Sequence, residues 1–450
     1  MLRKIFLALT CLLHSAISRA DDWPQWLGQR RDGVWREAGI IRRFPEGGPK
    51  LRWKVSVSGG YSSPAVADGR VFVTDWTAKP QSETPKNLNG GAIPKNQNFV
   101  RELHPGMESV RCFRESDGKL IWQHEYDCSY TTVSTYAIGP RCSPTVDGEF
   151  VYTLGSEGHL LCLKVSTGDV LWSRDFVKQD NAKVPFWGFA AHPLIDGDRL
   201  ICVSGGKAGV CVALNKFTGD VLWQSLSAKE PGYCAPVIYE VAGRRQLIVW
   251  HSDSVNGLDP STGEVFWSVP FQATFAMSIG MPRLEGNRLF IMCFSRQCAA
   301  IDIAKDGRSA TIAWRGNSRR GIGGVHNTPV LVNGYIYGCD NGGRYTCASL
   351  RTGERLWTSY APSSAERPLH WGNVFTIRHA NRFFLANDKG DLIIARLSPD
   401  GYEELSKAHL IEPTHKVGPR MLVWSHPAFA NRSVYLRNDQ EMRCYLLAAE

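Results

Sequence analysis

Residues 162–172 read CLKVSTGDVLW, and the same motif returns at 213–223 as ALNKFTGDVLW and at 257–267 as GLDPSTGEVFW. In every copy a Gly stands four residues before a Trp. Weaker copies end at Trp122 and Trp357, and a degenerate one ends at Trp314. A repeat every forty to fifty residues, with the content of strand, turn and strand, is typical of propellers and repeat arrays.

A second recurring element precedes each copy of this motif. It is a Pro followed by apolar residues around a tight turn, as in residues 64–73 (PAVADGRVFV) and 144–152 (PTVDGEFVY). Asp-Gly between two apolar runs indicates a hairpin, because both central residues of a type I′ turn need positive φ. Each unit therefore predicts four antiparallel strands, which form one propeller blade.

The number of these front halves predicts how the fold closes. Eight are present, and the last one reaches the C-terminus without a fourth strand. Residues 51–55 (LRWKV) are an unpaired strand with its own Trp53. We therefore predict an all-β fold, an eight-bladed β-propeller of four-stranded antiparallel blades whose last blade is closed by an N-terminal strand, which leaves no open sheet edge. The front halves begin at Pro64, Pro144, Pro193, Pro236, Pro282, Pro329, Asn373 and Pro427.

The chain divides into a leader, a lead-in and the propeller. Residues 1–20 combine a basic start, an apolar run and small residues before the predicted cleavage after Ala20, which is typical of a signal peptide. Residues 21–50 form the lead-in and residues 51–450 the propeller, with a long polar insert at 75–110 in the first blade. Cys11 lies inside the apolar run, which argues against a lipid anchor. We expect a periplasmic or secreted monomer.

Two classes of partner are disfavoured by composition. No other stretch approaches 18 apolar residues, so no membrane span is expected. Basic pairs are scattered and form no block, which argues against nucleic-acid binding.

The cysteines allow two interpretations. Of the 13 in the chain, all but Cys11 follow the leader, an even number for an oxidising compartment. Three pairs flank predicted hairpins and can either bridge or stay reduced: Cys202/Cys211, Cys293/Cys298 and Cys339/Cys347. Four cysteines, Cys347 among them, share one strand position where the remaining blades carry Ala or Gly, so they are interpreted as small packing residues: Cys112, Cys162, Cys347 and Cys444.

The repeated motif resembles that of the pyrroloquinoline-quinone (PQQ)-like β-propeller family, secreted bacterial type. The opening residues 23–34 (WPQWLGQRRDGV) also resemble the lead-in of secreted members. The resemblance implies the propeller fold but not one activity, since the family includes quinoprotein dehydrogenases and the non-catalytic scaffold of outer-membrane protein assembly. Function has to be argued from the site.

The candidate site is the mouth of the central channel, where eight segments that enter the innermost strands converge. Six of these segments contain Gly, and the others supply aromatic, His, Arg and amide side chains, the mixture of a ligand pocket. The predicted ligand-binding residues are Tyr61, Arg141, Trp187, His192, Tyr233, Arg320, His326, Asn327, His370, Trp371, Asn373, Trp424 and His426.

The four histidines in that set allow a transition-metal site as one interpretation and strand-capping hydrogen bonds as the other. Because their spacings run between blades, we assign no metal ligand.

Two functions remain in view for this face. The resemblance to quinoprotein dehydrogenases implies PQQ with Ca²⁺, an adjacent cysteine pair and an acidic base, yet the chain has no Cys-Cys pair and the converging segments contain no Asp or Glu. We therefore assign no catalytic residue and no cofactor, and favour a binding or scaffold module with a protein or small-molecule ligand. A PQQ-dependent alcohol or sugar dehydrogenase is the alternative, and strand addition of a partner peptide a third.

The insert at 75–110 bears on that choice. A loop of this length is usually functional or disordered, so we expect either an ordered lid over the mouth or a floppy insertion. Glu102, His104 and Glu108 are its candidates for the missing carboxylates, provided that one of the acids reaches Asn327 or Asn373.

Overall fold

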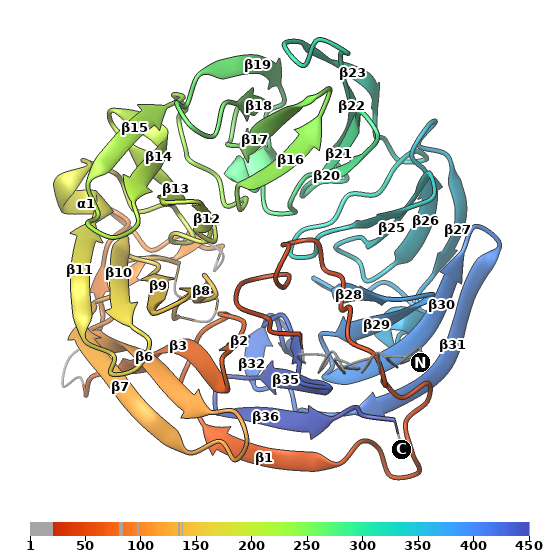
Figure 1. Cartoon of the computed structure of the whole chain (residues 1–450), viewed down its shortest axis with the longest axis horizontal. Helices are drawn as coiled ribbons and strands as arrows, with labels where there is room; N and C mark the ends of the chain where they lie inside the picture. The colour runs from red at the N-terminus through yellow and green to blue at the C-terminus, as the bar shows by residue number, and fades with distance from the viewer. Residues whose placement is uncertain (1–20, 81–83, 97–98, 134–135, 137, 450) are drawn as a thin grey trace, which may run out of the picture.

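Eight four-stranded antiparallel sheets surround a central axis (Figure 1). The computed structural model describes residues 21–80, 84–96, 99–133, 136 and 138–449. The predicted eight-bladed propeller is confirmed. The predicted signal peptide at 1–20 lies outside the described residues. Within the described ranges, no helix is long and apolar enough to cross a membrane.

Each blade runs outward from an inner strand through neighbouring antiparallel strands. The first four blades are β2 (Ala65–Ala67), β3 (Arg70–Ala78), β6 (Gly106–Arg114), β7 (Leu120–Asp127); β8 (Thr145–Asp147), β9 (Phe150–Leu154), β10 (His159–Lys164), β11 (Val170–Asp175); β12 (Leu194–Asp196), β13 (Arg199–Gly206), β14 (Gly209–Asn215), β15 (Val221–Ser225); and β16 (Val237–Val241), β17 (Arg244–Trp250), β18 (Ser254–Leu258), β19 (Val265–Pro270).

The other four blades complete the ring. They are β20 (Arg283–Glu285), β21 (Arg288–Met292), β22 (Cys298–Ile303), β23 (Ala310–Arg315); β24 (Val330–Val332), β25 (Tyr335–Cys339), β26 (Tyr345–Ser349), β27 (Arg355–Ser359); β28 (Val374–His379), β29 (Arg382–Asn387), β30 (Asp391–Ser398), β31 (Gly401–His409); and β34 (Ala428–Ala430), β35 (Ser433–Arg437), β36 (Glu441–Leu446) with β1 (Leu51–Ser56). β1 pairs antiparallel with β36, so the ring closes through both ends of the propeller as predicted.

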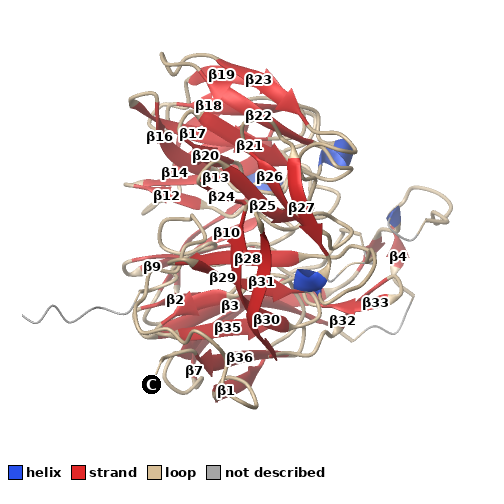
Figure 2. Cartoon of the chain, turned by 90° about the vertical axis from the view of Figure 1, so that its right-hand side faces the viewer, coloured by secondary structure: helices blue, strands red, loops and turns tan. Residues whose placement is uncertain are grey.

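Among the residues that the structure describes, two hairpins and three single-turn helices with assigned bounds lie outside the blades. The hairpin of β4 (Lys86–Asn87) with β5 (Glu102–Leu103) belongs to the insert, and that of β32 (His415–Val417) with β33 (Arg420–Leu422) precedes the last blade. Figure 2 shows both protruding on the same face of the ring. The helices are α1 (Phe176–Gln179), η2 (Thr274–Ala276) and η3 (Ala361–Ser363).

The repeated Gly and Trp pack neighbouring blades together. A Cβ added to Gly168 would lie 2.5 Å from the ring of Trp122 in the preceding blade, and Trp122 Nε1 donates to the Val165 carbonyl at 2.8 Å. Within a blade, the Trp faces a small residue across the sheet, since Cys112 pairs with Trp122. The Gly contact recurs at four further interfaces: Trp53 with Gly118, Trp172 with Gly219, Trp223 with Gly263 and Trp314 with Gly353.

The candidate disulfides are wrong, because the 12 cysteines of the described chain are all free and buried. In the first pair, Cys202 lies opposite Val212 while Cys211 lies opposite Val203. Neighbours along a strand face opposite sides of a sheet, so these two thiols are separated by the sheet itself. The same offset separates Cys293 from Cys298, since Cys298 lies opposite Met292. Cys339 and Cys347 share a face but are displaced by two positions.

The lead-in fills the channel, which the sequence did not predict. Figure 1 shows the segment before β1, in red, running through the centre of the ring. Arg31 is only 2% exposed and donates to the carbonyls of His192 at 3.2 Å, Pro236 at 2.8 Å and Pro193. Burial lowers the pKa of Arg31 to about 10, which leaves the guanidinium charged at neutral pH. The lead-in therefore anchors two blades from inside.

Candidate binding cavity at the channel mouth

A cavity of about 290 Å³ opens on the face from which the two hairpins protrude. Nine of the thirteen predicted residues line it. They are Tyr61, Arg141, Trp187, His192, Tyr233, His326, Trp371, Trp424 and His426. Five further aromatic side chains that the sequence did not single out also line the cavity: Trp26, Phe99, Tyr136, Phe275 and Phe294.

The floor of the cavity comes from the lead-in. The ring of Trp26 stacks on His192 with centroids 4.4 Å apart and an interplanar angle of 10°. The same indole meets His426 edge to face at 5.5 Å. His192 Nδ1 in turn accepts from the Ser143 backbone N–H at 2.9 Å. The plugged channel thus becomes a closed pocket rather than a pore.

The walls are aromatic rings from several blades. Trp424 lies 4.2 Å from the ring of His326 and 5.8 Å from that of Tyr61, centroid to centroid. Trp187 meets Tyr233 edge to face at 5.9 Å on another side. Arg141 is the one cation of the described lining. Because no Asp or Glu accompanies it there, the cavity is apolar with a single positive charge.

Two aromatic residues at the rim have a backbone that costs free energy. Phe275 (φ 56°) and Trp371 (φ 56°) both adopt the left-handed region, which costs a non-glycine residue of the order of 1 to 3 kcal/mol. Phe275 is also 57% exposed. Such strain concentrates at ligand clamps and active sites. Here the strained backbone places the two apolar rings at the rim of the cavity.

The insert contributes to the same rim. Phe99 lies 6.1 Å from Phe275 and 5.6 Å from Phe186, centroid to centroid, and it lines the cavity together with Asn96. The loop between Val133 and β8 adds Tyr136. We expected the insert to be either an ordered lid or a floppy insertion, and the described part of the insert fits a lid.

The cavity histidines are neutral at physiological pH. Burial lowers the pKa of His326 and of His426 to about 3, with a further contribution from Arg141 at His326. Burial also holds the pKa of His192 well below its usual range, and the positive charge of Arg31 adds to this effect. These rings therefore act as flat, weakly polar surface rather than as cations.

Several buried nitrogen atoms of the lining have no hydrogen-bond partner. They are the indole Nε1 of Trp26, Trp371 and Trp424. A buried donor without a partner costs about 1 to 3 kcal/mol. Because these atoms have almost no accessible surface, the cavity presents mainly flat apolar surface.

Four predicted residues do not line the cavity. Arg320 packs over the Trp314 ring at 5.2 Å and donates to the Thr352 carbonyl, so it belongs to a blade interface. His370 is exposed. Asn327 Nδ2 donates to Asn373 Oδ1 at 2.9 Å, and this buried pair ties two blades together.

The insert acids do not supply the missing carboxylates. Glu108 is buried and accepts hydrogen bonds from the Tyr126 and Tyr130 hydroxyls, and Glu102 lies 3.4 Å from His104. Neither acid lines the cavity or bonds to Asn327, so the expectation that one of them would approach the amides is not met. The residues present thus do not fit Ca²⁺ with PQQ, which needs several oxygen ligands.

A metal site built from the mouth histidines is not supported either. Within the described chain, the one group of three or more potential ligands in mutual reach is Glu108, Cys128 and His159. None of the mouth histidines belongs to it.

The cavity residues that the sequence analysis missed differ in whether a sequence pattern could have identified them. Phe294 stands in the hairpin turn between β21 and β22, on the mouth side, so a search of such turns for aromatic residues would have found it. Trp26 could not be found in this way, because its place depends on contacts with His192 and His426, far along the chain.

Comparisons with known proteins agree with this geometry. A model of the family described as outer membrane protein assembly factor BamB matches residues 106–359. A Yersinia pestis protein of that name is 25% identical over 287 residues, which cover 60% of this chain and 66% of the relative, just under two thirds of its length.

Solved structures share the fold. BamB from Moraxella catarrhalis aligns with a TM-score of 0.51 at 16% identity, covering 82% of this chain and 98% of that one. Quinohemoprotein alcohol dehydrogenase from Comamonas testosteroni aligns with a TM-score of 0.60 at 12% identity, covering 95% and 81%. At such low identity both likenesses show the fold alone.

Proposed function

The chain belongs to the family described as outer membrane protein assembly factor BamB, and from this premise we propose that it is a non-catalytic binding propeller of the cell envelope. Its site is the channel-mouth cavity, and its ligand is an extended polypeptide segment with aromatic or aliphatic side chains. The names of the relatives favour a protein partner in the assembly of outer-membrane proteins. The predicted signal peptide favours a periplasmic location, and we propose a monomer.

The observation that carries this proposal is the chemistry of the cavity lining. Aromatic rings and neutral imidazoles bury apolar side chains. About 290 Å³ is at the small end of ligand pockets, which span roughly 300 to 1,000 Å³. Such a volume suits one or two side chains of a larger partner.

The dehydrogenase alternative lacks support in the same lining. A general base must lie within hydrogen-bond reach of the proton it removes, and the described lining holds neither Asp nor Glu. The three histidines have lowered pKa values and pack their rings against aromatic neighbours. The likeness to the Comamonas enzyme concerns the fold and adds nothing about this cavity.

The proposal is tested with a defined probe. Dye-labelled peptides of about ten residues, the length of an outer-membrane strand, would alternate Phe or Tyr with Ser and Thr. Fluorescence anisotropy would follow their binding to the mature protein. The matched control peptide replaces every aromatic residue with Ser, and we expect it not to bind.

Variants of the protein locate the binding. Trp424→Ala removes a central aromatic wall, and a loss of about 2 kcal/mol, typical of an interface hot spot, weakens binding about 30-fold. Phe217→Ala is the control, because Phe217 is 46% exposed in the turn between β14 and β15 on the opposite face. Equal affinity of both variants, or equal binding of both peptides, would contradict the proposal.

A further inference from the structure

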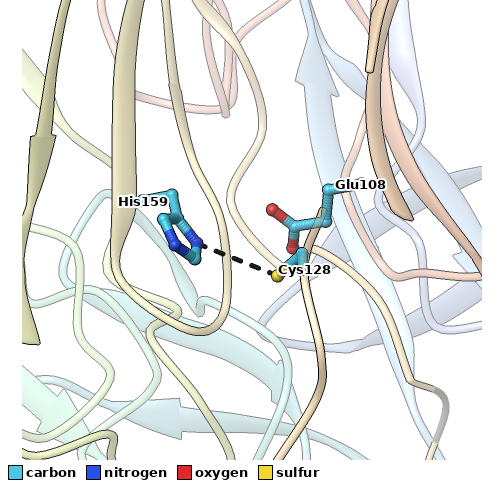
Figure 3. Close-up of side chains that lie close together, drawn as sticks. All are labelled: Glu108, Cys128 and His159. Atoms are coloured by element: carbon cyan, nitrogen blue, oxygen red, sulfur yellow. Dashed lines mark hydrogen bonds between the residues drawn. The ribbon is translucent and has the colours of Figure 1, made fainter. Parts of the chain in front are cut away.

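Three side chains that can bind metal meet between the first two blades (Figure 3). Glu108 comes from β6, Cys128 directly follows β7, and His159 begins β10. One potential ligand atom from each lies within 4.8 Å of the other two. Cys128 Sγ and His159 Nδ1 are 3.8 Å apart. The three residues form no recognisable sequence motif, because they come from separate strands of two blades.

Two of the three side chains, His159 and Glu108, have neighbours of the kind that orient the ligands of a metal site. Metal-bound His usually presents its second ring nitrogen to a carboxylate, and His159 Nε2 lies 3.7 Å from Asp175 Oδ2. Glu108 accepts from the hydroxyls of Tyr126 and Tyr130, one on each carboxylate oxygen. The backbone of Ser156 makes a third hydrogen bond to this carboxylate, and because a carboxylate has about four lone-pair sites, one remains for a metal.

From this arrangement we propose that Glu108, Cys128 and His159 form a zinc-class transition-metal site that joins the first two blades at the base of the insert. Thiolate, imidazole and carboxylate together select a borderline-soft divalent cation, and exclude Ca²⁺ and Mg²⁺, which prefer oxygen ligands alone. In a tetrahedral zinc site the ligand atoms lie about 3.3 to 3.7 Å apart, so the three groups need to close by about 1 Å.

The fourth position faces the more open side of the site. Cys128 and Glu108 are buried, whereas the His159 side chain is 28% exposed. Water completes the coordination from there, and the ion enters by the same route. Binding releases the thiol proton, so affinity is expected to increase with pH.

The site has a structural consequence for the candidate cavity. β6 is the strand by which the chain returns from the insert, and the insert bears Phe99 at the cavity rim. A metal bridge from β6 to β10 therefore fixes the base of the segment that covers the channel mouth.

Cobalt(II) titration of the chelator-stripped, reduced mature protein tests this inference. We expect one equivalent of Co²⁺ to produce intense tetrahedral d–d bands together with a thiolate-to-cobalt charge-transfer band, and Zn²⁺ to bleach both. Cys128→Ala removes the charge-transfer band. Cys162→Ala is the matched control. Cys162 is buried like Cys128 but lies in the second blade, and the fold accepts Ala there because the third blade carries Ala213 at the equivalent position.

A second variant covers the case in which Cys128→Ala does not fold. Asp175→Asn keeps the helix cap, since Asn caps as well as Asp, but weakens the contact that orients His159. We expect it to lower the affinity for Co²⁺ about 10- to 100-fold. Absence of the charge-transfer band in the unmodified protein, its persistence in Cys128→Ala, or unchanged affinity in Asp175→Asn would each overturn the proposal.

Discussion

The buried histidines of the cavity predict a stability that falls in mild acid. Burial lowers the pKa of His326 and His426 to about 3, against about 6.5 in an unfolded chain. The unfolded state therefore binds a proton first, so the stability from each neutral ring is present above pH 6.5 and is lost as the pH falls toward 3. At pH 5 an unfolded His is almost fully protonated while the folded one is not.

The magnitude follows from that difference. Each of the 1.5 pH units below 6.5 costs about 1.36 kcal/mol for each group, so each His lowers the free energy of unfolding by about 2 kcal/mol at pH 5. Together the two account for about 4 kcal/mol between pH 7.5 and pH 5. His326→Gln and His426→Gln should each reduce the loss measured between pH 7.5 and pH 5 by about 2 kcal/mol, whatever they do to stability at pH 7.5. His192 adds a loss of the same sign, because its pKa is also lowered.

Urea unfolding followed by tryptophan fluorescence at the two pH values provides the measurement. His370→Gln is the control, because this His is exposed beside the cavity. It should retain the loss measured for the unmodified protein. The reasoning is refuted if the cavity variants lose as much stability between pH 7.5 and pH 5 as the unmodified protein does.

Three further predictions concern the fold. Gly263→Ala should lower the free energy of unfolding by about 2 to 5 kcal/mol, because its φ is 75° and a Cβ would lie 2.6 Å from the Trp223 ring. Gly243→Ala is the control, because Gly243 has a φ of 74° but a Cβ there would have nothing within 4 Å; it should cost only about 1 to 2 kcal/mol in the same urea titration. Arg31→Met should cost about 3 to 5 kcal/mol by removing a charged donor from three buried carbonyls, and a loss under 1 kcal/mol would contradict the anchoring role of the lead-in. Thiol titration in denaturant with chelator should find 12 free thiols without reductant, whereas ten or fewer would indicate a disulfide.

The propeller could be predicted because its determinants are local and repeated. Gly168 and Trp172 mark one turn and one outer strand, and their recurrence counts the blades. β1 was predictable for the same reason, since Trp53 carries the outer-strand signature without a blade of its own. Nine of the residues predicted from the entries to the inner strands line the cavity.

The remaining features depend on long-range packing that no local pattern encodes. Arg31 reaches carbonyls of two blades, and its side chain looks in sequence like any exposed Arg in a basic pair. Asn327 lies at a strand entry as predicted, but its amide turns to Asn373 and away from the cavity. The alternation of side chains along a strand also determines whether two cysteines can form a disulfide. A register shifted by one residue would put Cys202 and Cys211 on the same face of the sheet.

The central claim, that the channel mouth binds polypeptide and is not a redox site, is tested most directly by one titration. The mature protein would receive PQQ with Ca²⁺ while the labelled aromatic strand peptide is bound, and dye-linked oxidation of alcohols and sugars would be followed in the same samples. We predict that the peptide stays bound and that no turnover appears. Saturable displacement of the peptide by PQQ, accompanied by Ca²⁺-dependent oxidation, would contradict the account.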